Sequence, residues 1–178
     1  MSAPVILLDR DGVLNVDLPT GVLRQEALEM VPGSAEAVAR LCQAGYRVLV
    51  CSNQACVGRG ELSLDELKRI NARISAAVRQ AGGAISAWYI CPHRAEENCD
   101  CRKPQPGLLL QAQAAYDFDL ATTCFVGDAV RDVQAAEAAG CQPILVRTGK
   151  GRASESEVPH VQAFDDLYAV ADQLLNHN

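Results

Sequence analysis

The chain has 178 residues, of which 49% are hydrophobic and 21% charged, and its formal net charge is −6. This length suits one domain with a proper core, and the acidic balance excludes the basic surface with which proteins bind nucleic acid. No apolar stretch approaches the roughly 20 residues that a membrane helix needs. The start of the chain, residues 1–4, lacks the charged and apolar regions of a secretion signal. We therefore expect a cytoplasmic monomer without nucleic-acid or membrane partners.

The first predicted strand ends at two carboxylates. Val5 to Leu8 are all apolar, and Asp9, Arg10, Asp11 and Gly12 follow directly. Such a run indicates a strand buried on both faces, as in a parallel sheet, where active sites lie beyond the carboxyl ends of the strands. Two adjacent carboxylates repel unless a cation or a shared proton stabilises them, and Mg²⁺ is the simplest such cation. The alternative is an acidic turn on a solvated loop, which rarely follows a buried run directly.

Residues 12–33 are irregular, because prolines and glycines interrupt any periodic pattern. Residues 22–23 and 28–31 could pair as a small hairpin. This segment is either a flap over a substrate or a plain connecting loop. Ser34 is the expected N-cap of a helix over residues 35–44, and a second strand over residues 46–51 ends at Ser52, Asn53 and Gln54. A hydroxyl and free backbone N–H groups there suit a phosphate, although a capping turn would use the same residue types.

The remaining elements alternate between helix and strand. A capping box at residues 63–66 opens a helix with apolar residues every three or four positions. Strands are expected over residues 85–90, 122–126 and 144–146. Helices are expected over residues 108–116 and 165–175, and another begins near Asp132 and ends at residue 139. A polar loop is expected over residues 147–160. The alternation predicts an α/β fold: a single doubly wound, Rossmann-like parallel sheet over residues 1–178, with the flap and no separate cap domain.

Three thiols and an imidazole lie within residues 91–101, at Cys91, His93, Cys99 and Cys101. This set matches a closed, structural zinc site of the Cys3His type. The loop has almost no apolar residues, so zinc would supply the free energy that folds it. The alternatives are free surface thiols or a disulfide in an oxidising compartment, which the lack of a secretion signal disfavours.

Further charged residues follow the zinc loop and the next strand. Arg102 and Lys103 come directly after the last thiol, and Asp128 ends the strand over residues 122–126. The two cations form either a phosphate clamp or a solvated basic pair, and we favour the clamp because zinc would hold them near the acidic site. Asp128 completes an acidic cluster with Asp9 and Asp11. Asp132 could orient a metal-bound water, Lys103 or the helix entry, or serve only as a first-turn acid.

These sequence stretches, in this order, resemble the four motifs of the haloacid dehalogenase superfamily of phosphotransferases. The matching stretches are residues 9–12, 52–54, 91–93 with 99–104, and 127–128. Within the superfamily the chain looks like the small zinc-containing group, the D,D-heptose 1,7-bisphosphate and histidinol-phosphate phosphatases. The zinc loop joined to Arg102, Lys103 and Pro104 is the most specific of these matches.

The resemblance implies a role for each matched residue. Asp9 would attack the phosphorus and form an aspartyl-phosphate, and Asp11 would act as general acid and then base, with a raised pKa. Lys103 and Ser52 would stabilise the transferring oxygens, and Arg102 would recognise the substrate. Mg²⁺ would be held by the carboxylates of Asp9 and Asp128 and the backbone carbonyl of Asp11. The other implied substrate-binding residues are Asp17, Thr20, Asn53 and Gln54.

The Gly58-Arg59-Gly60 run resembles the heptose enzymes. It favours hydrolysis of the 7-phosphate of D-glycero-D-manno-heptose 1,7-bisphosphate, in lipopolysaccharide synthesis, over histidinol phosphate. Cys56, residues 17–20 and Ala129 depart from the heptose pattern. Two non-enzymatic alternatives remain: a receiver-like domain that signals through a phospho-aspartate, and an inactive scaffold stabilised by zinc. Steady Mg²⁺-dependent phosphate release would exclude both.

Overall fold

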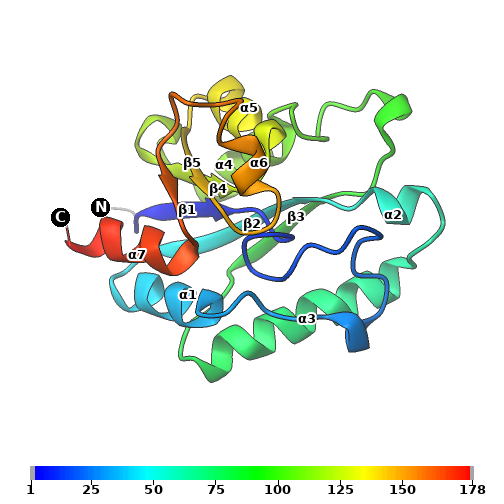
Figure 1. Ribbon diagram of the computed structural model, residues 1–178, viewed down its shortest axis with the longest axis horizontal. Helices are drawn as coiled ribbons and strands as arrows, with labels where there is room; N and C mark the ends of the chain where they lie inside the picture. Colours follow the sequence, from blue (N-terminus) through cyan, green and yellow to red (C-terminus); the bar gives the residue numbers. More distant parts are fainter. Residues whose placement is uncertain (1–2, 177–178) are drawn as a thin grey trace.

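The computed structural model describes residues 3–176, which form one six-stranded parallel sheet with helices on both faces (Figure 1). The strands are β1 (Val5–Leu8), β2 (Arg47–Asn53), β3 (Ala87–Cys91), β4 (Cys124–Gly127), β5 (Gln142–Val146) and β6 (Ala163–Phe164). Their order is β3-β2-β1-β4-β5-β6, and every neighbouring pair is parallel. The predicted single doubly wound domain is confirmed.

The helices cover the two faces of the sheet. They are α1 (Ser34–Gln43), α2 (Ala55–Gly58), α3 (Leu64–Gln80), α4 (Gly107–Tyr116), α5 (Val130–Ala139), α6 (Gly151–Ser154) and α7 (Leu167–Asn176). Ile6 and Leu8 of β1 pack in one core with residues of α1, α3 and α7. Val5 and Leu7 point the other way, into a core with α4 and α5. The predicted first strand is thus buried on both faces, as its unbroken apolar run indicated.

Two predicted helix starts differ in detail from the structure. Helix α1 begins at Ser34, and Gly33 precedes it with a φ of 78°. The Ser34 hydroxyl donates to the Leu14 carbonyl at 2.8 Å instead of capping the helix. The Ser63 hydroxyl does cap α3 by accepting from the Glu66 backbone N–H, whereas the Glu66 carboxylate accepts from the Gln25 N–H, at 3.0 Å. That second bond joins the flap to α3.

The flap contains no hairpin of the predicted residues. Instead, Val16 N–H donates to Glu29 and Val31 N–H to Leu14, and a short 3-10 helix spans Gln25–Ala27. The predicted polar loop over residues 147–160 contains the short helix α6, and β6 follows it. The two-residue strand β6 is too short to leave a periodic pattern in the sequence.

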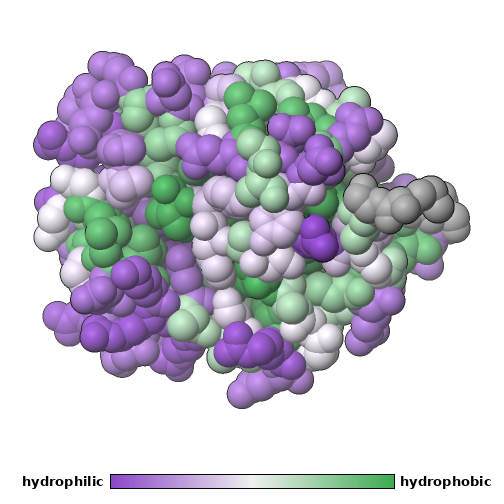
Figure 2. Space-filling model, turned by 180° about the vertical axis from the view of Figure 1, so that it is seen from behind, coloured by the Kyte–Doolittle hydropathy of each residue, from purple (hydrophilic) through white to green (hydrophobic). Residues whose placement is uncertain are grey.

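None of the helices in the described part of the chain is long and apolar enough to cross a bilayer. The face seen from behind combines hydrophilic areas, most of them toward its edges, with separate hydrophobic areas (Figure 2).

Candidate active site

Of the predicted acidic cluster, Asp9 and Asp128 meet where the strand order reverses, and the third carboxylate of that group is Asp132 instead of Asp11. Asp9 follows β1 and Asp128 follows β4, the two central strands. Consecutive connections leave these strands toward opposite faces, which opens a crevice at their carboxyl ends. Carboxylate oxygens of Asp9, Asp128 and Asp132 lie within 4.8 Å of one another, and all three residues are buried.

The surroundings of Asp128 fit a divalent cation. Its Oδ2 accepts the Lys150 backbone N–H at 2.8 Å, whereas its Oδ1 is buried and has no hydrogen-bond partner among the described residues. Gly12, with a φ of +83°, packs so closely that an added Cβ would overlap the carboxylate. Burial, and next the charges of Asp9 and Asp132, raise the pKa of Asp128 to about 7. A cation bound here would relieve this repulsion and give Oδ1 a partner.

Lys103 is the only cation in contact with the acidic cluster in the described part of the chain. Its Nζ lies 2.9 Å from Asp9 Oδ1 and 2.7 Å from Asp132 Oδ1, and it donates to the Cys51 carbonyl at 3.0 Å. The ammonium therefore has two carboxylate oxygens and one backbone carbonyl oxygen within 3.0 Å. Burial lowers the pKa of Lys103, but the charges of Asp132 and Asp9 outweigh burial and raise it, so the side chain stays charged.

Asp132 positions the site, and two of its expected roles are realised. One carboxylate oxygen contacts Lys103, and the other accepts the backbone N–H groups of Asp128 and Ala129 at 3.2 and 3.0 Å. It thereby fixes both the lysine and the entry to α5. Its charge also contributes, after burial, to the raised pKa of Asp9, which is about 6.

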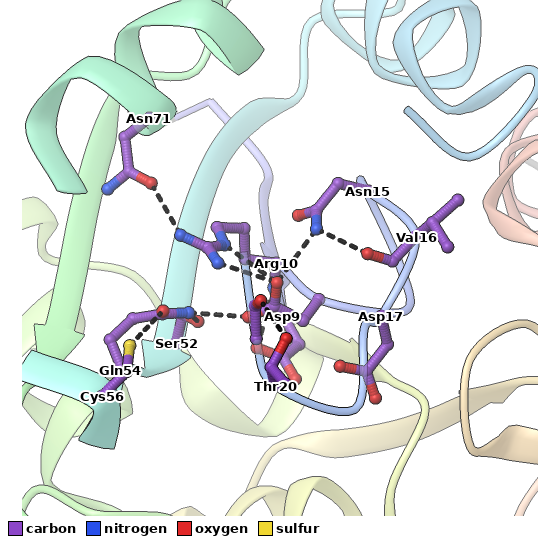
Figure 3. A network of polar contacts seen from close by, with 12 residues as sticks. Asp9, Arg10, Asn15, Val16, Asp17, Thr20, Ser52, Gln54, Cys56 and Asn71 are labelled. Carbon is purple, nitrogen blue, oxygen red and sulfur yellow. Dashed lines mark hydrogen bonds and ion pairs between the residues drawn. The ribbon is translucent and has the colours of Figure 1, made fainter. Parts of the chain in front are cut away.

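The pKa of Asp11 lies below its ordinary value, so the prediction of a raised pKa was wrong. Burial raises it, but the adjacent Arg10 charge and hydrogen bonds from Arg10, Asn15 and Gln54 outweigh burial. Arg10 is fully buried and donates to Asp11 Oδ1 at 2.8 Å and to Asn71 of α3 at 3.3 Å. Figure 3 shows the Arg10 side chain reaching from the Asp9 loop toward Asn71. The sequence pattern gave no indication that this guanidinium is buried.

The three polar residues at the end of β2, Ser52, Asn53 and Gln54, do not share one hydrogen-bond partner. The Gln54 side chain donates to Asp11 Oδ2 at 2.7 Å and to the Ser52 hydroxyl at 2.9 Å. The Asn53 amide forms two hydrogen bonds with the backbone of Lys103, at 3.0 and 3.1 Å. Asn53 thus anchors the loop that carries the lysine, in addition to lining the cavity beside Asp9.

A cavity of about 150 Å³ opens above the carboxylates. The predicted residues Asp17 and Thr20 line it, so the flap does cover the site, while Ser52 and Lys103 lie buried and outside this lining. Arg131 and Lys150 also line the cavity and were missed. Lys150 follows β5, and the convergence of parallel strand ends could have indicated it. Arg131 gave no comparable signal, since a helical arginine is usually solvated.

Arg102 lies apart from this cavity. Its guanidinium donates to the His93 carbonyl at 3.3 Å, and it lines a separate cavity with residues of the zinc loop. The largest apolar cavity, about 460 Å³ between α3 and β3, contains none of the carboxylates of the acidic cluster.

The four predicted zinc ligands come together. Sγ of Cys99 lies 3.6 Å from that of Cys91 and 3.5 Å from that of Cys101, and His93 Nδ1 lies 3.3 Å from Cys101 Sγ. Tetrahedral Zn²⁺ with Zn–S bonds of about 2.3 Å spaces its sulfurs by about 3.8 Å. All four donor atoms lie within 4.8 Å of one another, and the cysteines are unpaired. The donor set and its spacing therefore fit a structural zinc ion.

Comparisons with known proteins agree with this site. A family model described as HAD-hydrolase-like matches residues 100–174. The chain is 44% identical over 98% of its length to the D-glycero-β-D-manno-heptose-1,7-bisphosphate 7-phosphatase of Pseudomonas aeruginosa, of which it covers 99%. The Bordetella bronchiseptica D,D-heptose 1,7-bisphosphate phosphatase, solved with magnesium and phosphate, superposes with a TM-score of 0.95 at 40% identity, with 98% and 99% of the two chains covered. The Burkholderia thailandensis phosphatase of the same name superposes with a TM-score of 0.75 at 34% sequence identity. The match covers 97% of this chain and 98% of that protein. The chain thus belongs to the haloacid dehalogenase superfamily and, within it, to the D,D-heptose 1,7-bisphosphate phosphatase family.

Proposed function

We propose that this protein is a Mg²⁺-dependent phosphatase that removes the 7-phosphate of D-glycero-β-D-manno-heptose 1,7-bisphosphate. The observation that carries the proposal is the full-length similarity to phosphatases of that name, at 44% identity in Pseudomonas aeruginosa. The buried cluster of three carboxylates and one lysine at the strand ends supplies the chemistry. Histidinol phosphate remains the second substrate to test, although none of the relatives described above bears that name.

Magnesium would be held by the carboxylates of Asp9 and Asp128, with the Asp11 carbonyl as a further ligand. Asp128 Oδ1, buried without a partner, supports this assignment. When bound, Mg²⁺ neutralises charge on the phosphate, which lets an anionic carboxylate approach it. The magnesium in the Bordetella bronchiseptica structure belongs to that protein and supports the same choice of metal here.

We propose Asp9 as the nucleophile. Its Oδ1 is held by Lys103 and by the Arg10 backbone N–H at 2.7 Å. One carboxylate oxygen of Asp9 bonds to phosphorus as the bond to the sugar oxygen breaks, which gives an aspartyl-phosphate and an alcohol. Lys103, already charged and dehydrated, stabilises the transferring oxygens without further reorganisation.

Asp11 has two successive tasks that require opposite protonation states. In the free protein Arg10 keeps it ionised, which suits the later step, where it takes a proton from the attacking water. For the first step it must carry a proton to the leaving oxygen. The negative charge of the bound phosphate favours that proton, because like charges raise the pKa of a carboxyl group.

Phosphate release from heptose 1,7-bisphosphate and from histidinol phosphate, each with Mg²⁺ and with EDTA, tests the function. We expect turnover of the heptose substrate, dependent on Mg²⁺ and abolished by Asp9→Asn. Faster turnover of histidinol phosphate would overturn the substrate assignment. A stable phosphoprotein without turnover would instead support the receiver-like alternative.

We further propose one structural zinc ion per chain, bound by Cys91, His93, Cys99 and Cys101. Because zinc needs the cysteines as thiolates, these ligands support a reducing compartment such as the cytoplasm. The monomeric state stays a prediction, which the mass in solution would check.

A further inference from the structure

The cavity above the carboxylates has a cationic side. Arg59, Arg131 and Lys150 line it together with Asp9 and Asp11. Arg59 is paired with Glu61 at 2.8 Å, and Lys150 with Asp17 of the flap at 3.0 Å. Arg131 has no ion pair or hydrogen bond among the described residues, and its Nε is buried without an acceptor. It is therefore the cation of this cavity that lacks an anionic partner in the described part of the chain.

Arg131 is also held on a rigid element. It is the second residue of α5, next to Asp132, which fixes the start of that helix through two backbone N–H groups. Its backbone therefore cannot move independently of the acidic cluster. A side chain on such a support presents its charge in a reproducible place.

A partly dehydrated guanidinium without an acceptor is costly, since a buried donor loses its water without replacement. A phosphate would relieve this cost, because its oxygens match the planar fork of arginine and accept two N–H bonds at once. The reacting phosphate already has Lys103, which lies at the base of the site beside Asp9. Arg131 is left for a second anionic group at the other end of the same ligand.

We propose that Arg131 binds the second phosphate of the substrate, the one that is not hydrolysed, and so selects sugar bisphosphates over monophosphates. This inference rests on the proposed function, whose site it completes. It assigns the role to a residue inside the cavity, whereas Arg102 donates to the His93 carbonyl and lines a different cavity.

The test compares Arg131→Ala, Arg131→Lys and Arg102→Ala with the control Arg79→Ala, an exposed arginine on α3 outside the cavity. The substrates are heptose 1,7-bisphosphate and p-nitrophenyl phosphate, which has one phosphate. We expect Arg131→Ala to lower kcat/KM for the bisphosphate about 10- to 100-fold, mainly through KM, and to change that for p-nitrophenyl phosphate less than about 2-fold. Arg131→Lys should fall in between, because it keeps the charge and loses the fork.

Equal losses on both substrates, or no loss, would overturn the role of Arg131. A selective loss in Arg102→Ala alone would transfer that role to Arg102. If the wild-type protein released no phosphate from the heptose substrate, the proposed function would fail. Arg131 would then be tested by competition, as the ratio of inhibition by a sugar bisphosphate and its monophosphate against p-nitrophenyl phosphate. An unchanged ratio in Arg131→Ala would overturn its role independently.

Discussion

Replacing Lys103 with methionine should be the most damaging single change at the acidic cluster. The residue is 1% exposed, and its ammonium contacts Asp9, Asp132 and the Cys51 carbonyl. Methionine has nearly the same length, so packing is largely kept while the charge disappears. Breaking a buried ion pair by removing one partner costs about 3–5 kcal/mol, out of a total stability of roughly 5–15 kcal/mol for a domain.

The cost should depend on pH, because the carboxylates left behind can take up protons. The pKa of Asp9 is already raised to about 6, through burial and then the charge of Asp132. Removing the lysine raises it further. At about pH 5 the abandoned carboxyl group is neutral, and the loss should approach the lower end of this range. At about pH 8 the Asp9 carboxyl group must either stay charged in a buried site or take up a proton from a solution in which protons are scarce. Either cost makes the loss of stability larger than at about pH 5.

Urea unfolding without added Mg²⁺, followed by circular dichroism at both pH values, measures this loss. The control is Lys68→Met on α3, where the side chain is 77% exposed and pairs with Asp65 at 3.7 Å. That change should cost less than about 1 kcal/mol. Saturating Mg²⁺ should restore part of the stability of Lys103→Met, since it returns a cation to the cluster. A loss below about 1 kcal/mol at both pH values would refute the assignment of Lys103 as the charge that holds the carboxylates together.

The remaining predictions concern the metals. Gly12→Ala should abolish Mg²⁺ binding and lower activity at least about 10-fold, because the added Cβ overlaps the Asp128 carboxylate. The control is Gly45→Ala, which is also at positive φ but has open space around it. It should lose only about 1–3 kcal/mol of stability. Normal Mg²⁺ affinity in Gly12→Ala by calorimetry would contradict this. The raised pKa values of Asp9 and Asp128, about 6 and 7, mean that ionising these groups destabilises the metal-free fold as the pH rises through that range. The increase in Tm on adding Mg²⁺ should therefore be larger at about pH 8 than at about pH 5, and an equal increase would speak against the cluster as the binding site. Cys99→Ser should reduce bound zinc from one equivalent to well below one by metal analysis, with a lower Tm; unchanged zinc and Tm would exclude a structural role.

Local sequence determined those features whose parts are close together along the chain. The four candidate zinc ligands lie within eleven residues, so their spacing alone indicated the site, and the structure places their donor atoms within 4.8 Å of one another. The unbroken apolar run of β1 predicted a strand buried on both faces, and these residues are buried in the structure. Together with the regular alternation of elements, these patterns were enough to predict the fold class and the position of the acidic pair.

Contacts between distant residues were decided only by the tertiary structure. Arg10 contacts Asn71, 61 positions away, and Gln54, 43 positions from Asp11, donates to the Asp11 carboxylate and helps to keep its pKa low against the effect of burial. Asn53, 50 positions from Lys103, anchors that lysine, and Arg131 reaches the same cavity as Asp9. The pKa of a carboxyl group depends on every charge around it, and a sequence shows only the neighbours along the chain. The sequence therefore predicted the candidate reacting groups, whereas their protonation and the cations around the cavity depend on how the strand ends converge in the folded sheet.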